Sequence, residues 1–449
     1  MSESNLITTI DPATGKILRE YPIHTPQEIA RIVQAAANGF QDWRRVPIEK
    51  RRELLTKLAQ LLRRDQDQLA VLMQEEMGKR TEEGKSEVEK CAAAADYYAE
   101  NGPKFLRPIP IATDAQKSYV AFEPIGTVLA IMPWNFPFWQ AVRCAVPALL
   151  AGNTVILKHA SSVTGCSLAL EKLVQEAAGR KDLFQSVLLR GKEALPLIGK
   201  SEISAISFTG STEAGRAVAE AAGKALKKCV LELGGSDAYV VLADANIAEA
   251  AKICANSRLI NMGQSCISAK RFIVEKKVRA EFEAHFIKFL EAAPTAPLAR
   301  ADLRDQLHQQ VEKTLAAGGK LLCGGKIPGG AGAFYPVTAI SAVKPGMTIF
   351  EEETFGPVAA IIEAEGEKEA IALANRTNFG LGAAVFTEDR TRGDRLAREE
   401  LEAGSCFVNA LVKSDARLPF GGTKESGYGR ELSGFGIREF VNVKTVYIS

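Results

Sequence analysis

The sequence has few of the patterns that mark a disulfide-rich, metal-binding or membrane-spanning protein. Its eight cysteines form no C-x-x-C pair and its four histidines lack the spacing typical of a metal site, so we expect no metal. No apolar run reaches the roughly 18 residues needed to span a bilayer, and the N-terminal residues contain no secretory signal. These absences predict a cytoplasmic protein with reduced cysteines and no membrane partner. The cysteines are Cys91, Cys144, Cys166, Cys229, Cys254, Cys266, Cys323 and Cys406.

Net charge is also nearly absent. The 449 residues include 56 Lys and Arg against 54 Asp and Glu, which leaves a formal charge of +2. A balance this close to neutral argues against nucleic acid as a partner, because such binding depends on a basic surface. Apolar residues are plentiful, at 46% of the chain, which is enough to form large cores without stabilising disulfide bonds or metal ions. The length favours about three domains.

Strand and helix patterns alternate through the middle of the chain. Near-continuous apolar runs predict buried strands, and amphipathic segments between them predict helices. This alternation is typical of an α/β fold with a parallel sheet covered on both faces. Such sheets bind ligands at the carboxyl ends of their strands. The predicted strands are 126–132, 153–158, 183–189, 203–208 and 229–233, and the predicted helices are 137–150, 163–178, 212–226 and 247–259.

The flanking regions have patterns of their own. Upstream, Thr25 and Glu28 have the spacing of a capping box, with proline at the first helical position. Downstream, a second α/β block covers roughly 232–410. The segments 107–123 and 440–449 are expected to be extended.

Two motifs at predicted strand ends suit the binding of negative charge. Gly210 and Ser211 open a Gly-rich turn between a strand and a helix, where backbone N–H groups can bind phosphate. A simple tight turn is the alternative. Asn135 lies between two prolines after another strand, where its amide can stabilise a developing oxyanion. An Asx-type turn is the alternative for Asn135.

Two further residues suit covalent chemistry and proton transfer. Cys266 is surrounded by glycine and small polar residues, so a substrate could reach its sulfur, although no histidine is close in sequence to activate it. Glu232 ends a predicted buried strand, where a carboxylate must be solvated, paired or functional. The residues alone therefore leave Cys266 as either a nucleophile or a small buried side chain. They leave Glu232 as either a general base or a member of an ion pair.

Seven motifs follow one another along the chain: PWNFP (133–137), LKHAS (157–161), FTGSTEAG (208–215), LELGG (231–235), GQSC (263–266), EEETFGPV (351–358) and PFGGTKESGYGRE (419–431). In this order they resemble the aldehyde dehydrogenase superfamily, and the resemblance covers the chain from about residue 8 to its end. Within the superfamily the sequence is most similar to the short succinate-semialdehyde dehydrogenases.

The resemblance implies an aldehyde dehydrogenase-like α/β fold. A Rossmann-type cofactor domain would comprise 1–106 and 124–231, and an α/β catalytic domain 232–410. Segments 107–123 and 432–449 would form a small β oligomerisation arm, so we expect a homodimer or homotetramer. Segment 411–431 would form a substrate loop and the return to the cofactor domain.

The resemblance also implies oxidation of an aldehyde through a covalent cysteine adduct. Cys266 would attack the aldehyde carbon, and Asn135 with the backbone N–H of Cys266 would hold the oxyanion. After hydride passes to a nicotinamide, Glu232 would activate the water that hydrolyses the thioester. Positioned proton transfer of this kind accelerates a step by about 10²–10⁴-fold.

The resemblance further implies where the cofactor binds. Ser161 is the informative position, because many NAD-preferring relatives have a glutamate there that would repel a 2′-phosphate. Serine removes that repulsion and Lys158 adds positive charge, so we expect NADP to be preferred and NAD tolerated. The implied cofactor-binding residues are Trp134, Lys158, Ser161, Gly210, Ser211, Gly234, Glu353 and Phe355.

Two residues are expected to bind the substrate. Arg143 lies eight residues past Asn135, so at 1.5 Å per helical residue it would sit roughly 10 Å from the oxyanion site. Arginine binds carboxylates bidentately, and Ser414 matches a loop residue that helps to hold the same carboxylate in the resemblance. A surface or interface ion pair is the alternative for Arg143.

The sequence therefore predicts NADP-dependent oxidation of succinate semialdehyde to succinate. One alternative is a dehydrogenase for another small aldehyde, such as glutarate semialdehyde or an aromatic aldehyde. The other is a binding protein that kept the fold and lost the activity.

Overall fold

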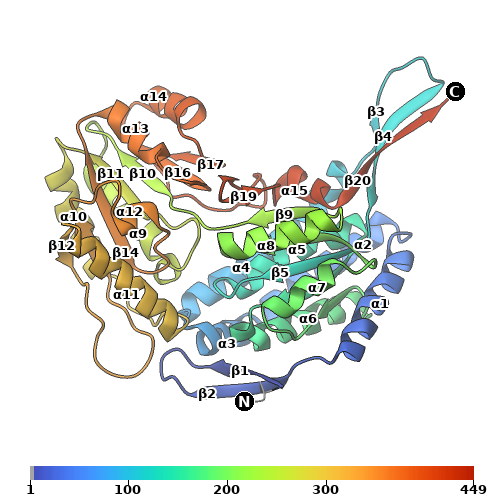
Figure 1. Cartoon of the computed structure of the whole chain (residues 1–449). Helices are drawn as coiled ribbons and strands as arrows, with labels where there is room; N and C mark the ends of the chain where they lie inside the picture. The colour runs from blue at the N-terminus through green and yellow to red at the C-terminus, as the bar shows by residue number, and fades with distance from the viewer. Residues whose placement is uncertain (1–4) are drawn as a thin grey trace.

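The computed structural model describes residues 5–449, and two sheets organise it into two α/β bodies (Figure 1). The first sheet is parallel except for one short edge strand, which pairs antiparallel with its neighbour. Its strand order is β19-β9-β8-β5-β6-β7. The strands are β5 (Thr127–Met132), β6 (Thr154–His159), β7 (Phe184–Ser186), β8 (Ile203–Thr209), β9 (Lys228–Glu232) and β19 (Gly427–Tyr428).

Helices cover both faces of this sheet because successive strand residues point to opposite sides. Val128 and Ala130 of β5 pack into one core, whereas Leu129 and Ile131 of the same strand pack into another. The first core contains residues of α2 (Ile48–Arg64), α3 (Gln66–Met77), α4 (Thr81–Phe105), α5 (Pro137–Ala151) and α6 (Thr164–Ala178). The second contains residues of α1 (Pro26–Trp43), α7 (Leu195–Ile198) and α8 (Thr212–Lys224).

The predicted elements of this body agree closely with the structure. All five strands and the helices α5, α6 and α8 begin and end within about three residues of the predicted bounds. The capping box is present, since Glu28 N donates to Thr25 Oγ1 at 3.3 Å and Thr25 N donates to Glu28 Oε2 at 2.8 Å. The predicted strand 183–189 is shorter in the structure, where the strand is only Phe184–Ser186.

The second body is built on a seven-stranded sheet of order β12-β13-β14-β11-β10-β16-β17, in which only the β12–β13 pair is antiparallel. Helices α9 (Ile247–Leu259) and α10 (Arg279–Glu291) cover one face, and α11 (Ala301–Ala316) and α13 (Glu367–Asn375) the other. The strands are β10 (Ala238–Val241), β11 (Arg271–Glu275), β12 (Lys320–Cys323), β13 (Thr338–Ser341), β14 (Val358–Ala364), β16 (Gly382–Phe386) and β17 (Ser405–Val408).

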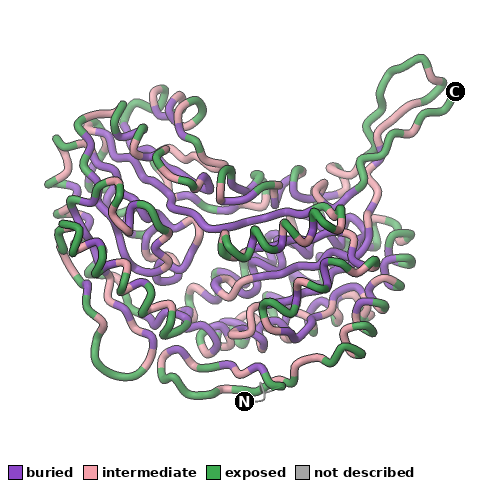
Figure 2. The backbone as a smooth tube through the Cα atoms, in the orientation of Figure 1, coloured by how far each residue is buried: buried purple, intermediate pink, exposed green. Residues whose placement is uncertain are grey.

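A three-stranded arm extends away from both bodies (Figure 1). It consists of β3 (Ile109–Pro110), β4 (Lys117–Pro124) and β20 (Val441–Ile448), and β20 pairs with β4 along its whole length. Most of the arm is exposed or half-buried (Figure 2). The predicted arm segment 432–449 also includes α15 (Ser433–Glu439), but this helix packs on the body, since Tyr98 Oη donates to Ser433 O at 3.1 Å.

Smaller elements complete the chain at its edges. A hairpin of β1 (Leu6–Ile10) and β2 (Ile17–Pro22) lies near the N-terminal end, below the first body in Figure 1. Within residues 5–449, no helix combines the length and the apolar character that crossing a membrane requires. The same residues contain no cluster of three His, Cys, Asp or Glu side chains arranged to hold a metal ion.

Candidate active site

The sequence-predicted site residues follow the carboxyl ends of adjacent parallel strands. Asn135 follows β5, Lys158 lies near the end of β6, Gly210 follows β8 and Glu232 ends β9. Since β6, β5, β8 and β9 are neighbours in this order, the four residues lie along one edge of the sheet. Cys266 comes from the second body. The two parts meet closely, because a Cβ on Gly235 would lie 2.7 Å from the Cys266 carbonyl oxygen.

The backbone before the cysteine has an unusual conformation. Asn261 and Met262 have φ values of 52° and 53°, in the left-handed region that ordinary residues rarely adopt. Buried side chains hold this turn, since Arg258 Nη2 donates to Gly263 O at 2.6 Å and Asn261 Nδ2 donates to Asn135 O at 2.8 Å. The turn therefore fixes where Cys266 lies relative to Asn135.

Asn135 is placed to donate a hydrogen bond beside the cysteine. Its side chain is 3% exposed, and its Nδ2 donates to the carbonyl oxygen of Gln264 at 3.0 Å. Lys79 Nζ donates to the Asn135 carbonyl oxygen at 2.9 Å and fixes the backbone. A primary amide has two N–H donors, so the second remains for an oxyanion formed next to Cys266.

The Cys266 thiol is half-buried between cationic groups. Burial raises its pKa to about 11, while the positive charges of Arg143 and Lys270 oppose that rise. Lys270 is held in place because its Nζ donates to the carbonyl oxygens of Ser265 and Cys266. The thiol is therefore protonated near neutral pH in this structure, and it requires activation before it can attack.

Glu232 has a buried carboxyl group that, within residues 5–449, has no hydrogen-bond partner on either oxygen. Burial raises its pKa well above the usual range, and the neighbouring carboxylate of Glu431 raises it further. The backbone of Gly421 packs against it so closely that a Cβ there would lie 2.8 Å from Glu232 Oε1. Both effects disfavour the charged form of the carboxyl group, and water or a positive charge that reaches it would favour the ionised form that can act as a base.

Arg143, the predicted substrate-binding residue on α5, is buried and has a charged partner. Its side chain is 2% exposed, and its guanidinium forms an ion pair with Glu431. It also donates to Thr209 Oγ1 at 3.2 Å and lies over the ring of Phe420 at 5.0 Å. The role of Arg143 in binding a substrate carboxylate stays a prediction, and in this structure the carboxylate of Glu431 already neutralises its guanidinium.

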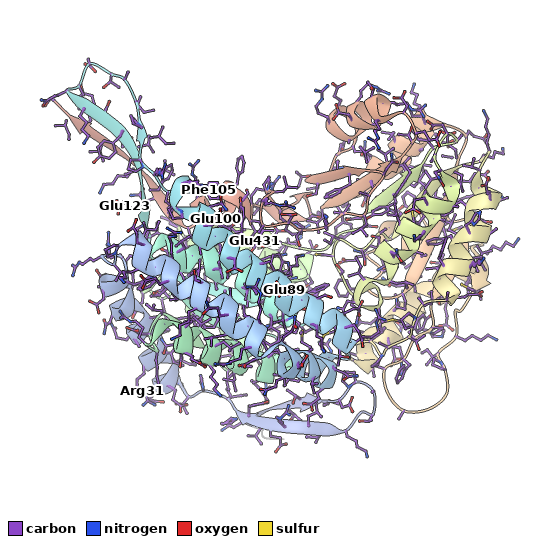
Figure 3. All side chains as sticks on the ribbon, turned by 180° about the vertical axis from the view of Figure 1, so that it is seen from behind. Arg31, Glu89, Glu100, Phe105, Glu123 and Glu431 are labelled. Atoms are coloured by element: carbon purple, nitrogen blue, oxygen red, sulfur yellow. The ribbon has the colours of Figure 1, made fainter. Side chains whose placement is uncertain are left out.

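The partner of Arg143 comes from the far end of the chain. Glu431 ends the last of the seven motifs, and its backbone N–H and carbonyl pair with Phe420. In Figure 3, Glu89 and Glu100 mark the outer face of α4, and Glu431 lies between their labels behind that helix. Its place beside Arg143 and Glu232 could not be found from spacing, because these residues are far apart in sequence.

A large cavity adjoins the carboxyl end of β6. It has a volume of about 850 Å³, and Lys158, Ser161, Ser162, Gly191 and Arg300 are among the residues that line it. Burial lowers the pKa of Lys158 to about 8, so the amine still carries positive charge at neutral pH. The cavity therefore has the size and charge for a phosphorylated ribose.

The remaining predicted cofactor residues lie between β8 and the second body. Ser211 caps α8, where its side chain accepts from Ala214 N at 3.3 Å, and Gly210 N donates to Glu232 O at 3.1 Å. A Cβ on Gly234 would lie 2.6 Å from Glu353 Oε2, so the carboxylate of Glu353 lies close to the backbone there.

Glu353 and Phe355 reach the same region from the second body. Glu353 accepts from Gly235 N at 3.1 Å and pairs with Lys270 at 3.3 Å. The rings of Trp134 and Phe355 meet edge to face at 5.7 Å. A helix N-terminus, a glycine-containing turn and an aromatic pair suit a dinucleotide, so the residues present fit the implied cofactor.

One cation near the site was missed by sequence analysis. Lys90 on α4 donates from its Nζ to Ser414 Oγ at 2.7 Å, so the predicted residue Ser414 has a basic neighbour. The ammonium also lies over the ring of Trp139, 4.3 Å from its centroid. No local pattern marks Lys90, because the helical spacing of α4 assigns it only to the edge of an apolar face.

Comparison with known proteins agrees with this geometry. The family model described as "Aldehyde dehydrogenase family" matches residues 1–446. The Escherichia coli protein named succinate semialdehyde dehydrogenase [NAD(P)+] Sad is 44% identical, with 98% of this chain and 97% of that protein covered. A Synechocystis protein named probable succinate-semialdehyde dehydrogenase [NADP(+)] is 43% identical, with 99% and 100% covered.

Solved structures agree as well. The succinic semialdehyde dehydrogenase of Streptococcus pyogenes, solved with NADP+ as the cofactor, superposes with a TM-score of 0.96. The two chains are 36% identical, and the match covers 98% of this chain and 99% of the other. With the thiol, the amide and the carboxyl group gathered where the two bodies meet, and with relatives matching over the full length, the chain belongs to the aldehyde dehydrogenase family.

Proposed function

We propose that the protein oxidises succinate semialdehyde to succinate, with NADP as the preferred cofactor and NAD tolerated. The observation that carries this proposal is the meeting of Cys266, Asn135 and Glu232 beside a cavity lined by Lys158 and Ser161. Relatives at 40–44% identity that are named for this reaction support the choice of substrate. When bound, the dinucleotide supplies the hydride acceptor.

The first step belongs to Cys266 and Asn135. The thiol loses its proton to solvent, and the sulfur forms a bond to the aldehyde carbon while the carbonyl π electrons move to oxygen. The free N–H of the Asn135 amide and the backbone N–H of Cys266 would donate to that oxygen. Donors fixed in a dry site stabilise an oxyanion without reorganising, and the buried turn at Asn261 supplies this rigidity.

The last step belongs to Glu232. After the carbon is oxidised, the acyl group is held on Cys266 as a thioester. Glu232 takes a proton from a water whose oxygen bonds to the acyl carbon. The carbon–sulfur bond then breaks, which restores the Cys266 thiolate and releases the free acid. A carboxyl group with a raised pKa is a stronger base once ionised, which favours hydrolysis over transfer of the acyl group to another thiol.

The preference for NADP rests on the wall of the large cavity. Ser161 brings a hydroxyl and no negative charge, and Lys158 brings a buried cation. A 2′-phosphate could accept a hydrogen bond from the Ser161 hydroxyl and would be attracted by the Lys158 cation, with no negative charge to repel it. An unphosphorylated ribose can still use the hydroxyl, which is why we expect NAD to be tolerated.

We also propose that the arm joins copies of this chain into a homodimer or homotetramer. Val443, Tyr447 and Ile448 on β20 and Ile109 on β3 are large apolar side chains with 41–62% of their surface exposed. Apolar patches on a projecting strand pair suit an interface with a second copy. Equilibrium sedimentation should find a stable oligomer, and Val443→Lys with Tyr447→Lys should shift the mass towards the monomer.

The activity itself is tested by steady-state kinetics on the intact enzyme. Succinate semialdehyde, glutarate semialdehyde, butanal and benzaldehyde would each be assayed with NADP and with NAD. We expect the highest kcat/KM for succinate semialdehyde with NADP, and we expect Cys266→Ala to abolish reduced-cofactor formation. A higher value for glutarate semialdehyde or benzaldehyde would instead support one of the other aldehyde substrates, and no turnover would support a binding protein.

A further inference from the structure

We propose that Lys270 is a positioning residue for the nucleophile: its buried ammonium holds the backbone carbonyl groups of Cys266 and the preceding residue, and its charge favours the thiolate form of Cys266. The carboxylate of Glu353 pairs with the same ammonium and opposes its effect on the thiol. The inference rests on the proposed function, in which Cys266 is the nucleophile. Lys270 would act only through its neighbours and would not itself react.

The ammonium of Lys270 is fully buried and has three acceptors around it. Its Nζ donates to the carbonyl oxygen of Ser265 at 2.9 Å and to that of Cys266. It also pairs with Glu353 Oε1 at 3.3 Å. An ammonium has three N–H donors, so these contacts use them all. A buried cation with such a set of acceptors keeps its charge, because two carbonyl dipoles and a carboxylate replace the lost water.

The backbone of Lys270 is anchored in the second sheet. Its N–H donates to Asp237 O at 3.0 Å, directly before β10, and its carbonyl oxygen accepts from Ala360 N of β14 at 3.0 Å. Strand β11 begins at the next residue, Arg271. Because the sheet fixes its backbone, the lysine side chain reaches from a rigid support back to the loop that carries Cys266.

The carbonyl oxygens of residues 263–266 all accept hydrogen bonds from buried side chains. Arg258 donates to the first of them at 2.6 Å and Asn135 to the second at 3.0 Å. Lys270 donates to the last two, one of which belongs to Cys266 itself. Buried donors whose own partners are satisfied rigidify the groups to which they bond. Lys270 therefore helps to keep the sulfur beside the Asn135 amide.

Charged groups from both bodies act on the Cys266 thiol. Burial raises its pKa most, Arg143 and Lys270 lower it, and Glu353 and Asp237 raise it. Arg143 acts from α5 in the first body, whereas the other three belong to the second. Opposite charges nearby favour an ionised group and like charges disfavour it. Loss of the Lys270 charge should therefore disfavour the thiolate, and loss of the Glu353 charge should favour it.

The same groups act on the ammonium of Lys270. Burial lowers its pKa most, Glu353 and Asp237 raise it, and the guanidinium of Arg258 lowers it. The thiol of Cys266 also raises it. Because the effect between ammonium and thiolate is mutual, each ionised form stabilises the other. The lysine and the cysteine thus form a buried pair whose charges support each other.

The test compares the intact enzyme, without cofactor, with Lys270→Met, Glu353→Gln, the double variant of these two and the control Lys276→Met. Lys276 is an exposed lysine that pairs with Glu365 at 2.7 Å. Alkylation of the Cys266 peptide by iodoacetamide would be followed by mass spectrometry from pH 6 to pH 10. Below its pKa, the reactive thiolate fraction changes about tenfold for each unit by which the pKa shifts.

The expected shifts have opposite signs. At pH 8 Lys270→Met should react about tenfold more slowly than the parent, and Glu353→Gln about tenfold faster. The double variant loses both charges and should return to within about threefold of the parent, while Lys276→Met should match it. Simple disruption of the loop would slow both single variants and the double variant most of all. A rate in Glu353→Gln at or below the parental rate, or a double variant slower than Lys270→Met, would overturn the proposal. Both outcomes can be read even if Lys270→Met alone fails to fold.

Backbone hydrogen exchange tests the hold on the loop. Exchange in a peptide spanning 261–268 would be measured by mass spectrometry in the parent, Lys270→Met and Lys270→Gln. Glutamine lacks the charge but retains an amide donor, so exchange should rise severalfold in Lys270→Met and less in Lys270→Gln. Equal exchange in the parent and Lys270→Met would overturn the positioning role. These readouts need no substrate, so they fail separately from the proposed function, which turnover of succinate semialdehyde by Cys266→Ala would overturn.

Discussion

Arg143 and Glu431 form an ion pair in the interior of the protein, directly beside the carboxyl group of Glu232. The pair joins helix α5 to the C-terminal return, and both members are less than 5% exposed. Glu431 raises the pKa of Glu232, and Arg143 lowers it. Together with burial, these two charges set the pH at which Glu232 ionises, and in the proposed mechanism that ionised form is the base.

Removing the charge of Glu431 should shift that pH downwards. In Glu431→Gln the like charge beside Glu232 is lost and Arg143 is released to attract the Glu232 carboxylate, so its pKa should fall. The acidic limb of the kcat profile for thioester hydrolysis should move to lower pH by one unit or more, by roughly the size of a close charge interaction. Glu425→Gln, which removes an exposed carboxylate paired with Arg216, serves as the control. A profile that stays in place or moves upwards would contradict this account.

The same pair predicts a stability effect. Arg143→Met leaves the Glu431 carboxylate buried without its partner, which should cost about 3–5 kcal/mol of unfolding free energy. The double variant with Glu431→Gln removes both charges and should recover much of that loss. Urea unfolding monitored by fluorescence would measure all three variants. Additive losses in the double variant would mean that the two side chains do not stabilise each other.

Glu232→Gln should lower the activity of the enzyme and raise its stability. The carboxyl of Glu232 has a folded-state pKa raised well above its ordinary value of 4.5. Its contribution to stability is present below that ordinary value and is lost as the pH rises, because the unfolded chain ionises first. The variant should therefore gain stability over the parent between pH 5 and neutral, with a limiting slope of about 1.4 kcal/mol per pH unit.

Two measurements check the Glu232 variant. Tm determined from pH 4 to pH 8 should coincide for parent and variant at pH 4 and diverge above it. Rapid mixing with substrate should still give a burst of reduced cofactor, followed by a slow steady state, because the acyl group cannot leave. A variant that turns over at the parental rate would exclude Glu232 as the base.

The resting thiol should respond steeply to pH. Since burial raises the pKa of Cys266 to about 11, the thiolate fraction in the free enzyme should rise roughly tenfold per pH unit up to pH 10. Alkylation by iodoacetamide, followed by mass spectrometry of the Cys266 peptide, would report that rise. Cys406, another half-buried thiol, provides an internal reference on β17, the edge strand of the second sheet. A rate at Cys266 that levels off near pH 8 would show that the thiol is already activated in the free enzyme.

Sequence patterns were sufficient to predict the strands and helices that build the site. They were insufficient to predict which charged side chains pair with one another around it. The runs ending at Met132 and Glu232 are buried strands because both faces of the parallel sheet are covered, and this makes their apolar pattern continuous. Asn135 and Cys266 were singled out because they lie in short motifs that resemble those of the family, and their catalytic roles stay predictions. The pairing of Arg143 with Glu431 depends on how the C-terminal segment returns to the first sheet at β19, and no local pattern encodes that return.

Lys90 is a second charged residue whose surroundings could not be predicted from the sequence. On a helix, its charge alone would place it on a solvated face, as charged residues usually lie. It faces a cavity because α5 brings Trp139 and the C-terminal loop brings Ser414 against α4. A cluster of side chains supplied by three distant segments can be recognised only once the fold has brought them together.

The choice of cofactor can be tested at a single position. Ser161→Glu places a carboxylate in the wall of the cavity that also contains Lys158. That carboxylate would repel a 2′-phosphate, whereas it can accept a hydrogen bond from the 2′-hydroxyl of NAD. The kcat/KM for NADP should fall by about a hundredfold, as expected for loss of a charge-assisted contact and gain of a repulsion. The value for NAD should stay within about threefold of the parent or rise.

Ser161→Gln, which has the same size without the charge, separates electrostatic repulsion from steric crowding. It should lower the kcat/KM for NADP far less than Ser161→Glu does. Equal losses with both cofactors in Ser161→Glu would mean that this position does not contact the ribose phosphate.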